Sequence, residues 1–117
     1  MASTDTFETG SLNFNIKYEN DIRVPFTVLN ADATAYSFTN KTDSDLNIYT
    51  HNGGTLLKNI GESANSGLSY SSNVITWNDP WSDVGLGIGT YYYELTYEDS
   101  GFTVPTVKIY DGYIGVK

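Results

Sequence analysis

The sequence predicts an all-β fold, an antiparallel β-sandwich of about seven to ten short strands. Aromatic and β-branched residues are concentrated in short runs, of which the clearest is Gly-Thr-Tyr-Tyr-Tyr-Glu-Leu-Thr-Tyr at residues 89–97. Such side chains fit the pleated, half-buried surface of a sheet and lose rotamer freedom on a helix. Apolar residues also alternate with polar ones in several segments, and turns rich in glycine, asparagine and serine separate these segments.

The first half of the chain starts with a polar segment and continues with alternating runs. We expect residues 1–10 to form an N-terminal arm and residues 11–117 to form a single β-sandwich domain. Alternation with a period of two predicts strands at residues 12–16, 22–28, 36–38 and 46–50. Pro25 lies inside the second run. Because proline cannot donate a ladder hydrogen bond, this strand is predicted at a sheet edge or a bulge.

The second half is predicted to consist of hairpins around one central strand. Asn52-Gly53 predicts a hairpin with a type I′ turn, and Ser71-Ser72-Asn73 predicts a second tight hairpin. We expect a loop at residues 78–88, anchored by Trp81, in which only residues 79–83 could form a helical turn. After the central strand at 89–97, the pattern predicts a turn at 98–101, a strand at 103–110, a turn at Asp111-Gly112 and a last strand at 113–116.

The predicted core is made of large rings on the inward faces of the strands. Because successive side chains of a strand alternate between its faces, Tyr91, Tyr93, Leu95 and Tyr97 share one face, opposite Thr90, Tyr92, Glu94 and Thr96. The rings expected in the core are Phe14, Phe26, Phe38, Trp77 and two tyrosines of the central strand.

Charge and hydropathy exclude several classes of protein. The net charge is -8, from 14 acidic and 6 basic residues, and the basic residues are scattered. No basic stripe can neutralise phosphates, so we expect no nucleic-acid binding. No run approaches the roughly 18 apolar residues of a membrane span, and the polar start lacks the apolar segment of a signal peptide. We therefore expect no membrane association and synthesis in the cytoplasm. The acidity favours solubility, or an electrostatic fit to a basic partner surface.

Two short motifs resemble ligand-binding loops but lack positions that the chemistry requires. In Gly85-Leu86-Gly87-Ile88-Gly89 a strand follows where a helix N-terminus must receive a phosphate, so no nucleotide cofactor is predicted. Asp43 and Asp45 begin like an EF-hand loop, but Ile48 takes the glycine position and Gly54 the final acidic position. A simpler calcium loop of Asp43 and Asp45, or of Asp79 and Asp83, is left open beside the favoured interpretation of solvated turns. No metal site is predicted.

No catalytic residue is predicted either. His51 is the single histidine and there is no cysteine, so the chain offers neither an evident triad nor a zinc–thiolate site. Glu94 lies among tyrosines in the central strand, where a glycosidase would need a second carboxylate at a fixed distance. No pattern identifies that second carboxylate. We therefore expect a protein that is not an enzyme and needs no cofactor.

The chain contains more aromatic rings than its core requires. Ten Tyr, five Phe and two Trp make up 15% of the residues. Tyrosine combines a large apolar body with a polar tip, which suits interfaces. The rings predicted to bind a partner are Phe7, Tyr49, Tyr70, Trp81 and Tyr97. Phe7 is expected to anchor the arm on a neighbouring chain, because buried apolar area must offset the conformational entropy that the arm loses on binding.

Five segments, in this order, carry a resemblance to a known family. They are Val-Pro-Phe-Thr-Val at 24–28, Phe-Thr-Asn-Lys-Thr at 38–42, Gly-Leu-Ser-Tyr-Ser-Ser-Asn-Val-Ile-Thr-Trp at 67–77, Gly-Thr-Tyr-Tyr-Tyr-Glu-Leu at 89–95 and Asp-Gly-Tyr-Ile-Gly-Val at 111–116. The pattern resembles the small immunoglobulin-like β-sandwich domain at the N-terminus of phage baseplate upper proteins, and similar modules of tailed-phage virions. The resemblance implies a structural attachment module with no catalytic motif. Since the domain here is nearly the whole chain, a stand-alone virion accessory is favoured over a baseplate role.

The sequence thus leaves two functions open. The first is a non-enzymatic phage virion structural protein, an auxiliary or decoration protein of the capsid or another accessory, with capsid, tail or baseplate proteins as partners and the virion as its location. The second is a carbohydrate-binding module in which exposed rings such as Tyr49, Tyr70, Trp81 or Tyr97 stack on the sugars of a host-surface glycan. Coplanar exposed rings on one face would favour sugar binding, and a contiguous apolar patch would favour assembly.

Overall fold

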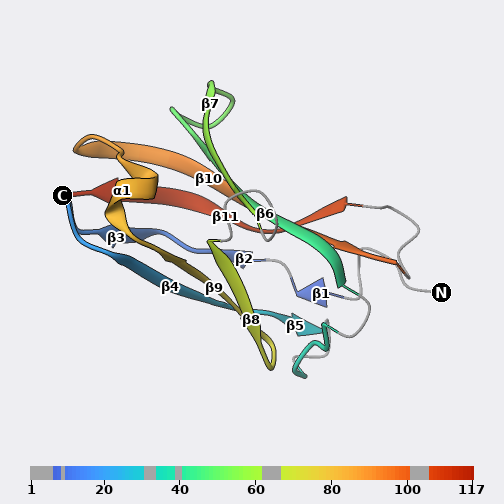
Figure 1. Ribbon diagram of the computed structural model, residues 1–117. Coiled ribbons are helices and arrows are strands. Elements are labelled where there is room, and N and C mark those ends of the chain that lie inside the picture. Colours follow the sequence, from blue (N-terminus) through green and yellow to red (C-terminus); the bar gives the residue numbers. More distant parts are fainter. Residues whose placement is uncertain (1–6, 9, 31–33, 39–40, 62–66, 101–105) are drawn as a thin grey trace.

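The computed structural model describes residues 7–8, 10–30, 34–38, 41–61, 67–100 and 106–117. Most of these residues lie in strands, and the one helix among them, α1 (Trp81–Val84), is a single turn. Two sheets face each other across a common core in a molecule of 43 × 27 × 24 Å (Figure 1). The predicted all-β, sandwich-like architecture is confirmed.

The larger sheet has six strands in the order β2–β11–β10–β6–β7, with β3 also paired to β11. Their bounds are Gly10–Ser11 for β2, Phe14–Ile16 for β3, Lys41–Tyr49 for β6, Leu56–Gly61 for β7, Gly89–Asp99 for β10 and Thr106–Val116 for β11. The pairs among β6, β7, β10 and β11 are antiparallel, whereas β2 and β3 run parallel to β11. The larger sheet is therefore mixed, whereas the sequence predicts only antiparallel pairing.

The smaller sheet has the order β4–β9–β8, with bounds Ile22–Thr27, Val74–Asp79 and Leu68–Ser71. Pro25 lies in β4 at the edge of this sheet, as its missing N–H donor predicts. A further pair joins β1 (Phe7–Glu8) to β5 (Leu29–Asn30). Residues 7, 8 and 10 thus belong to strands where the sequence predicts an arm. Residues 1–6, residue 9 and the side chain of Phe7 lie outside the described structure, so anchoring through Phe7 stays a prediction.

Two predicted turns have a different structure from the one expected. The β6–β7 hairpin exists, but its loop runs from residue 50 to 55 and is closed by a hydrogen bond from Thr50 N to Thr55 O of 3.0 Å. A type I′ turn needs a positive φ at both of its central residues. Gly53 has a φ of 82°, but Asn52 does not have a positive φ, so the prediction of a type I′ turn was wrong. The turn at Asp111-Gly112 was also wrong, because both residues continue β11 and pair with Glu94 and Tyr93 of β10.

The predicted third strand at 36–38 is replaced by an irregular segment that packs through its rings. Tyr36 N donates to Val28 O at 3.1 Å, and the single β-bridge nearby joins Leu29 to Ala35. The ring of Tyr36 lies 5.8 Å from that of Phe38, edge to face. Both rings pack against the core although the backbone of residues 36–38 forms no strand ladder. The apolar residues that predicted a strand are explained by the burial of their side chains alone.

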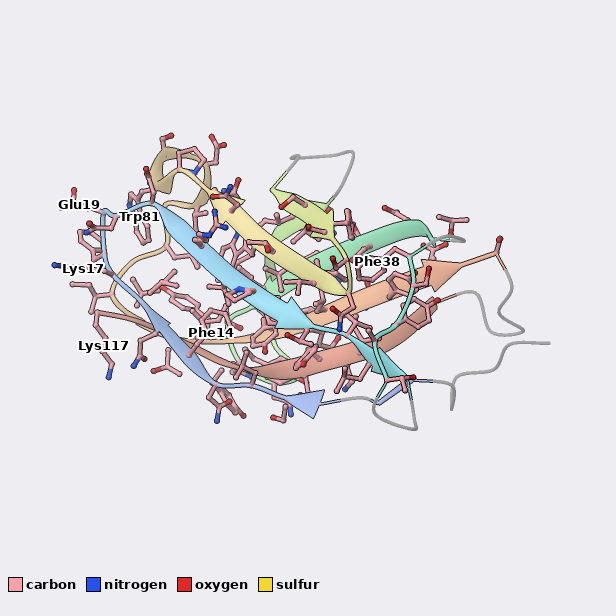
Figure 2. All side chains as sticks on the ribbon, turned by 90° about the horizontal axis from the view of Figure 1, so that it is seen from below. Phe14, Lys17, Glu19, Phe38, Trp81 and Lys117 are labelled. Carbon is pink, nitrogen blue, oxygen red and sulfur yellow. The ribbon has the colours of Figure 1, made fainter. Side chains whose placement is uncertain are left out.

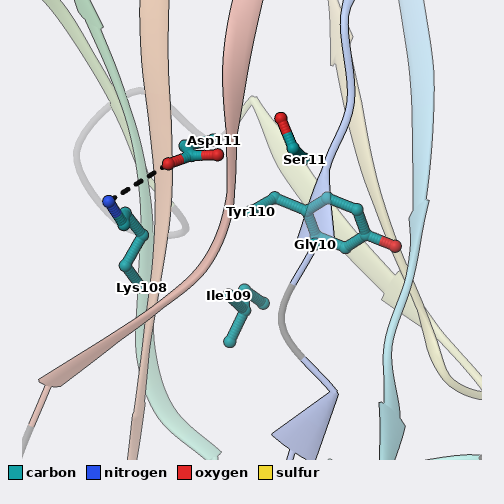
Figure 3. A pocket seen from close by; sticks show the side chains of 6 residues that line it. All are labelled: Gly10, Ser11, Lys108, Ile109, Tyr110 and Asp111. Atoms are coloured by element: carbon teal, nitrogen blue, oxygen red, sulfur yellow. Dashed lines mark ion pairs between the residues drawn. The ribbon is translucent and has the colours of Figure 1, made fainter. Parts of the chain in front are cut away.

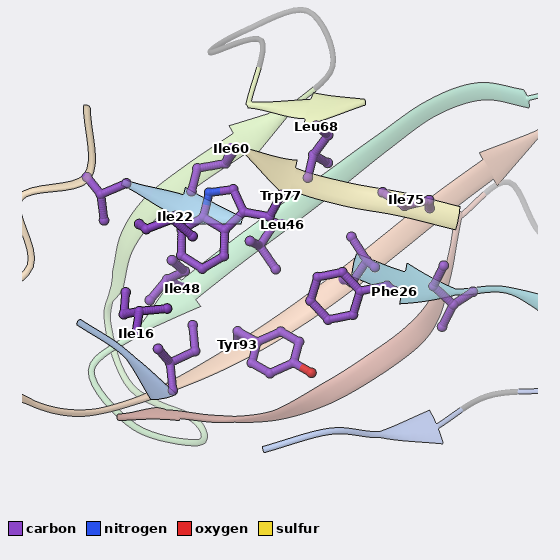
Figure 4. Close-up of a cluster of buried hydrophobic side chains, with 14 of the residues drawn as sticks. Ile16, Ile22, Phe26, Leu46, Ile48, Ile60, Leu68, Ile75, Trp77 and Tyr93 are labelled. Atoms are coloured by element: carbon purple, nitrogen blue, oxygen red, sulfur yellow. The ribbon is translucent and has the colours of Figure 1, made fainter. Parts of the chain in front are cut away.

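The core fills the space between the two sheets and contains the rings that the sequence predicts. Phe26, Trp77, Tyr93 and Tyr97 are fully buried, and Phe14 and Phe38 are partly buried against the same cluster. Figure 4 shows Trp77 surrounded by aliphatic side chains from both sheets, among them Ile22, Leu46, Ile60 and Leu68. The indole Nε1 of Trp77 donates to Asp79 Oδ2 at 2.8 Å, which satisfies its one polar group within the apolar surroundings.

Asp79 is expected to make the stability of the protein depend on pH. Burial raises the pKa of its carboxyl group, an effect that the hydrogen bond from Trp77 partly offsets. The folded state therefore binds a proton more tightly than the unfolded state, and stability is gained as the pH falls through the raised pKa and lost as it rises. Asp79→Asn keeps an acceptor for Trp77 and abolishes the titration.

Urea unfolding of both proteins at about pH 7 and about pH 4 tests this prediction. The stability of the variant relative to the wild type should be greatest near neutral pH and should decrease towards acid pH. A difference between the two proteins that stays constant with pH would contradict a raised pKa at Asp79.

Candidate functional site

The outer face of the larger sheet gathers aromatic and charged side chains from three neighbouring strands. Successive residues of β10 alternate, so Tyr93 and Tyr97 enter the core while Tyr92 and Glu94 lie on the outer face. This alternation confirms the two faces that the sequence predicts for the central strand. β6 and β11 flank β10 in register, and their outward side chains form rows across the strands.

A row of three tyrosines crosses this face. Tyr92 pairs in the ladder with Tyr113 of β11 on one side and with Tyr49 of β6 on the other. The ring centroid of Tyr92 lies 5.6 Å from that of Tyr113 and 6.2 Å from that of Tyr49. Tyr113 is 44% exposed, and Tyr92 between its neighbours only 6%. We call these three residues the tyrosine row.

A charged cluster lies beside the tyrosine row. Glu94 and Asp111 are direct partners in the β10–β11 ladder. Lys108 Nζ is 3.1 Å from Asp111 Oδ2, the pair marked in Figure 3, and 3.5 Å from Glu94 Oε2. The lysine offsets the repulsion that two like charges opposite one another would otherwise exert.

The tyrosine row and the charged cluster are joined by the hydroxyl of Tyr92. This hydroxyl lies 3.3 Å from both Glu94 Oε2 and Asp111 Oδ2, so it can donate to either carboxylate. Burial, followed by the charges of Asp111 and Glu94, raises the pKa of Tyr92. The pKa of Lys108 is raised mainly by its hydrogen bond to Asp111. The phenol therefore stays a donor and the lysine stays charged at neutral pH.

The far end of the same face is acidic. Asp43 of β6 pairs with Glu98 of β10, and Asp45 lies two residues along β6 on the same side. Partial burial and the negative charge of Asp43 raise the pKa of Asp45, while a hydrogen bond from Asn59 lowers it. We call Asp43, Asp45 and Glu98 the acidic end. It lies about 13–20 Å along the strands from the tyrosine row, at the end of the molecule where β1 and β5 pair (Figure 1).

Several hollows open on or beside this face. One of about 330 Å³ lies where β2 meets β11, with Lys108 and Asp111 on one side and Tyr110 beside Gly10 and Ser11 (Figure 3). A hollow of about 200 Å³ lies at the β6–β7 loop and is lined by Tyr49, Asn52, Gly53, Tyr92 and Glu94. A third, of about 260 Å³, lies at the opposite end of the tyrosine row and is lined by Asn13, Phe14, Asn15, Thr90, Tyr113, Gly115 and Lys117.

The rings predicted to bind a partner are not gathered at one place. Tyr49 belongs to the tyrosine row. Trp81 lies on α1 with its ring 5.3 Å from that of Tyr18, near Lys17, Glu19 and Lys117 at one end of the molecule (Figure 2). Tyr70 is half-buried, with its ring 5.6 Å from that of Phe38.

Tyr97 is a correction to the predicted set of exposed rings. Its side chain is fully buried, and its ring meets that of Tyr36 edge to face at 5.5 Å. The physical reason is the alternation of β10, which sends Tyr97 inward with Tyr93 and Leu95. Tyr97 therefore cannot stack on a sugar in the folded protein.

Sequence reasoning did not select Tyr92 and Tyr113 as site residues. The signal for Tyr92 was present, because it shares a face with Glu94 in the predicted strand. Tyr113 could be joined to it only through the register between β10 and β11, and the predicted turn at Asp111-Gly112 concealed that register.

The other residues considered from the sequence take ordinary places. His51 is exposed in the β6–β7 loop, with Nδ1 3.1 Å from Asn52 O. Asp79, a residue of one calcium loop left open above, is buried and accepts the indole hydrogen bond of Trp77. Within the described ranges, no three His, Cys, Asp or Glu residues are grouped so that they could hold a metal ion.

Comparison of the chain with protein-family models, with curated proteins and with solved structures finds no match. Of the residues that the structure describes, none belongs to a helix long and apolar enough to cross a membrane.

Proposed function

We propose that this chain is a non-enzymatic structural protein of a tailed-phage virion. It is made in the cytoplasm of the host and attaches to the assembled particle, as an auxiliary or decoration protein of the capsid or as another virion accessory. Its partners are capsid, tail or baseplate proteins, and its fold is immunoglobulin-like. The attachment surface is the acidic end of the larger sheet, which meets a basic patch on the partner.

The order of the strands supports the immunoglobulin-like part of the proposal. In an immunoglobulin domain, strands B, E and D form one sheet, while strands G, F and C, with C′ in the variable type, form the other. The smaller sheet here has the order β4–β9–β8, and the larger has β11–β10–β6–β7. When the strands of these two sheets are lettered along the chain from β4 as B, leaving out the two-residue β5 that pairs with β1, both orders agree with that arrangement.

The observation that carries the attachment surface is the grouping of three carboxylates at the acidic end, where no described Lys or Arg side chain forms an ion pair with them. Partial burial and the charge of Asp43 raise the pKa of Asp45, and a hydrogen bond from Asn59 only partly offsets them, so an ionised Asp45 lowers stability at neutral pH. A Lys or Arg side chain from a partner would relieve this cost and would also speed association by electrostatic attraction. The overall net charge of -8 also attracts a basic partner surface.

The charged cluster supports binding rather than catalysis. Both of its carboxylates are held by the same Lys108, and Tyr92 lies between them. Opposite charges paired across neighbouring strands are an ordinary way to stabilise a sheet surface, and this arrangement requires no catalytic role.

The test is attachment of the purified protein to phage particles that lack it, measured as occupancy against protein concentration. The double variant Asp43→Asn, Asp45→Asn should lower the affinity for the particle at least about tenfold. Occupancy of the wild type should fall when sodium chloride rises from about 0.05 to about 0.5 M, because the salt screens exposed charges. The variant protein should also be at least as stable as the wild type in urea.

The matched control removes two charges from the opposite end of the molecule. Glu19→Gln and Asp21→Asn together change the net charge by the same amount in an exposed segment, and they should leave occupancy unchanged. If both double variants weaken attachment equally, only net charge matters and the acidic end is not the contact. If the wild-type protein does not occupy the particles at all, the virion function itself is refuted.

A further inference from the structure

The hollow at the β6–β7 loop combines two aromatic rings with polar groups. It measures about 200 Å³ and is lined by Tyr49, Asn52, Gly53, Tyr92 and Glu94. Tyr49 ends β6, Tyr92 lies near the start of β10, and Asn52 and Gly53 belong to the loop. Two sheet strands thus fix the rings, and the hairpin loop provides the rim.

The rings give the hollow an apolar surface. The centroids of Tyr49 and Tyr92 are 6.2 Å apart and their planes are inclined by 42°, so the two rings are not stacked on each other. The face of an aromatic ring is electron-rich, and it attracts the weakly positive C–H bonds of a ligand that lies against it. A nucleotide would stack its flat base parallel to a ring and would bring phosphate groups, which the acidic surroundings repel.

The polar groups of the hollow are a mixture of donors and acceptors. Glu94 supplies acceptor oxygens, and the amide of Asn52 supplies both donors and an acceptor. Gly53 has a φ of 82°, and a Cβ built on it meets nothing within 4 Å, so its backbone is open to a ligand. Burial and the neighbouring Glu94 raise the pKa of Tyr49, which keeps its hydroxyl protonated. A ligand whose hydroxyl groups both donate and accept can satisfy this whole set.

The charge at the hollow favours a neutral ligand. The carboxylate of Glu94 already lies 3.5 Å from Lys108 Nζ and 3.3 Å from the hydroxyl of Tyr92. A cationic ligand would have to compete with that lysine. An anionic ligand would approach a protein of net charge -8.

From these contacts we infer that the hollow lined by Tyr49, Asn52, Gly53, Tyr92 and Glu94 is a binding subsite for a neutral saccharide. One face of the sugar ring lies against the half-buried ring of Tyr49, and its hydroxyl groups bond to Glu94, Asn52 and the backbone of Gly53. The subsite does not depend on the proposed virion attachment, because it lies at the end of the face opposite to the acidic end.

The continuation of the tyrosine row indicates a ligand longer than one sugar. Tyr113 lies next to Tyr92 with ring centroids 5.6 Å apart, and it lines the hollow of about 260 Å³ together with Asn13, Asn15 and Thr90. Two hollows with polar rims therefore lie at the two ends of one row of rings. An oligosaccharide placed across the row passes the buried ring of Tyr92 and reaches the exposed ring of Tyr113, whose plane is inclined by 65° to that of Tyr92.

Titration of the ¹⁵N-labelled protein with neutral oligosaccharides tests this inference. The probes are cellopentaose, maltopentaose and chitopentaose, each added to about 10 mM and followed by the backbone amide resonances. At least one probe should shift the amides of Asn52 and Gly53 in a saturable way. The apparent affinity should be unchanged between about 0.05 and 0.5 M sodium chloride, since a neutral ligand is not screened.

Variants assign the binding to the named residues. Tyr49→Ala and Asn52→Ala should each lower the affinity at least about tenfold, and Tyr113→Ala should weaken a pentasaccharide more than a disaccharide of the same linkage. Asn52→Ala changes an exposed loop residue, so it tests the subsite even if Tyr49→Ala does not fold. Tyr18→Ala removes an exposed ring elsewhere and should leave the affinity unchanged.

Two outcomes would overturn the inference. One is that none of the three oligosaccharides gives a saturable shift at these amides. The other is that a hexaarginine peptide shifts the same amides with an affinity that falls with salt while the saccharides do not, since the hollow would then be a cation subsite. Virion attachment is measured separately by occupancy, so either proposal can fail while the other stands.

Discussion

Replacement of Trp77 by alanine is expected to lower the free energy of unfolding by about 3–5 kcal/mol. The side chain is fully buried between the sheets, and its ring meets that of Phe14 edge to face at 6.3 Å. The variant loses this packing and leaves a cavity. It also lacks the indole N–H that donates a hydrogen bond to Asp79 Oδ2 at 2.8 Å. Urea unfolding followed by circular dichroism measures the change.

Two further variants separate the causes. Trp77→Phe keeps most of the ring volume but removes the indole N–H, so it should cost about 1–3 kcal/mol through the unsatisfied Asp79. Trp81→Ala removes a partly exposed indole from α1 and should cost less than about 1 kcal/mol. A Trp77→Ala protein as stable as the wild type would show that the indole is not a core side chain.

Replacement of Gly112 by alanine is expected to cost about 2–4 kcal/mol, which combines overpacking with backbone strain. A Cβ at this position would collide with the carbonyl oxygen of Leu12 and lie 2.8 Å from Asn13 Oδ1. Leu12 cannot easily retreat, because its N–H donates to Asp111 O at 2.9 Å. Gly112 also has a φ of 151°, which L residues rarely adopt. Thermal unfolding, with hydrogen exchange at β2 and β3, measures the loss.

Gly85→Ala is the control for the contact. Gly85 follows α1 with a φ of 58°, and a Cβ there meets nothing within 4 Å. Its substitution should therefore cost only the left-handed backbone penalty of about 1–2 kcal/mol. If the two variants lose equal stability, the close approach of Leu12 to Gly112 contributes nothing and the prediction fails.

Most strands were predictable because their signal is local. The alternation at residues 22–28 and 89–97 identified β4 and β10, and Pro25 identified an edge strand correctly. The parallel pairing of β3 with β11 was not predictable, since it joins residues about 100 positions apart in sequence and no local pattern encodes it. Asp111-Gly112 has the composition of a turn, but pairing with β10 on one side and contact with Leu12 on the other keep the strand extended.

The candidate site was predictable only in part, for a related reason. Tyr49 was selected as a binding residue and lies in the tyrosine row, whereas Tyr97 was selected and lies in the core. The faces of a single strand follow from its own sequence. The meeting of Tyr49, Tyr92 and Tyr113 follows from the register of three strands, which the sequence does not display.

The position of β11 has a consequence for folding during synthesis. β11 follows the other described strands in sequence, yet it lies between β10 and the two early strands β2 and β3. Among the described strands, β11 is the larger-sheet partner of both β2 and β3. On the ribosome, the early strands therefore stay without this partner while β4 to β10 are made, and the larger sheet is completed only after β11 has emerged.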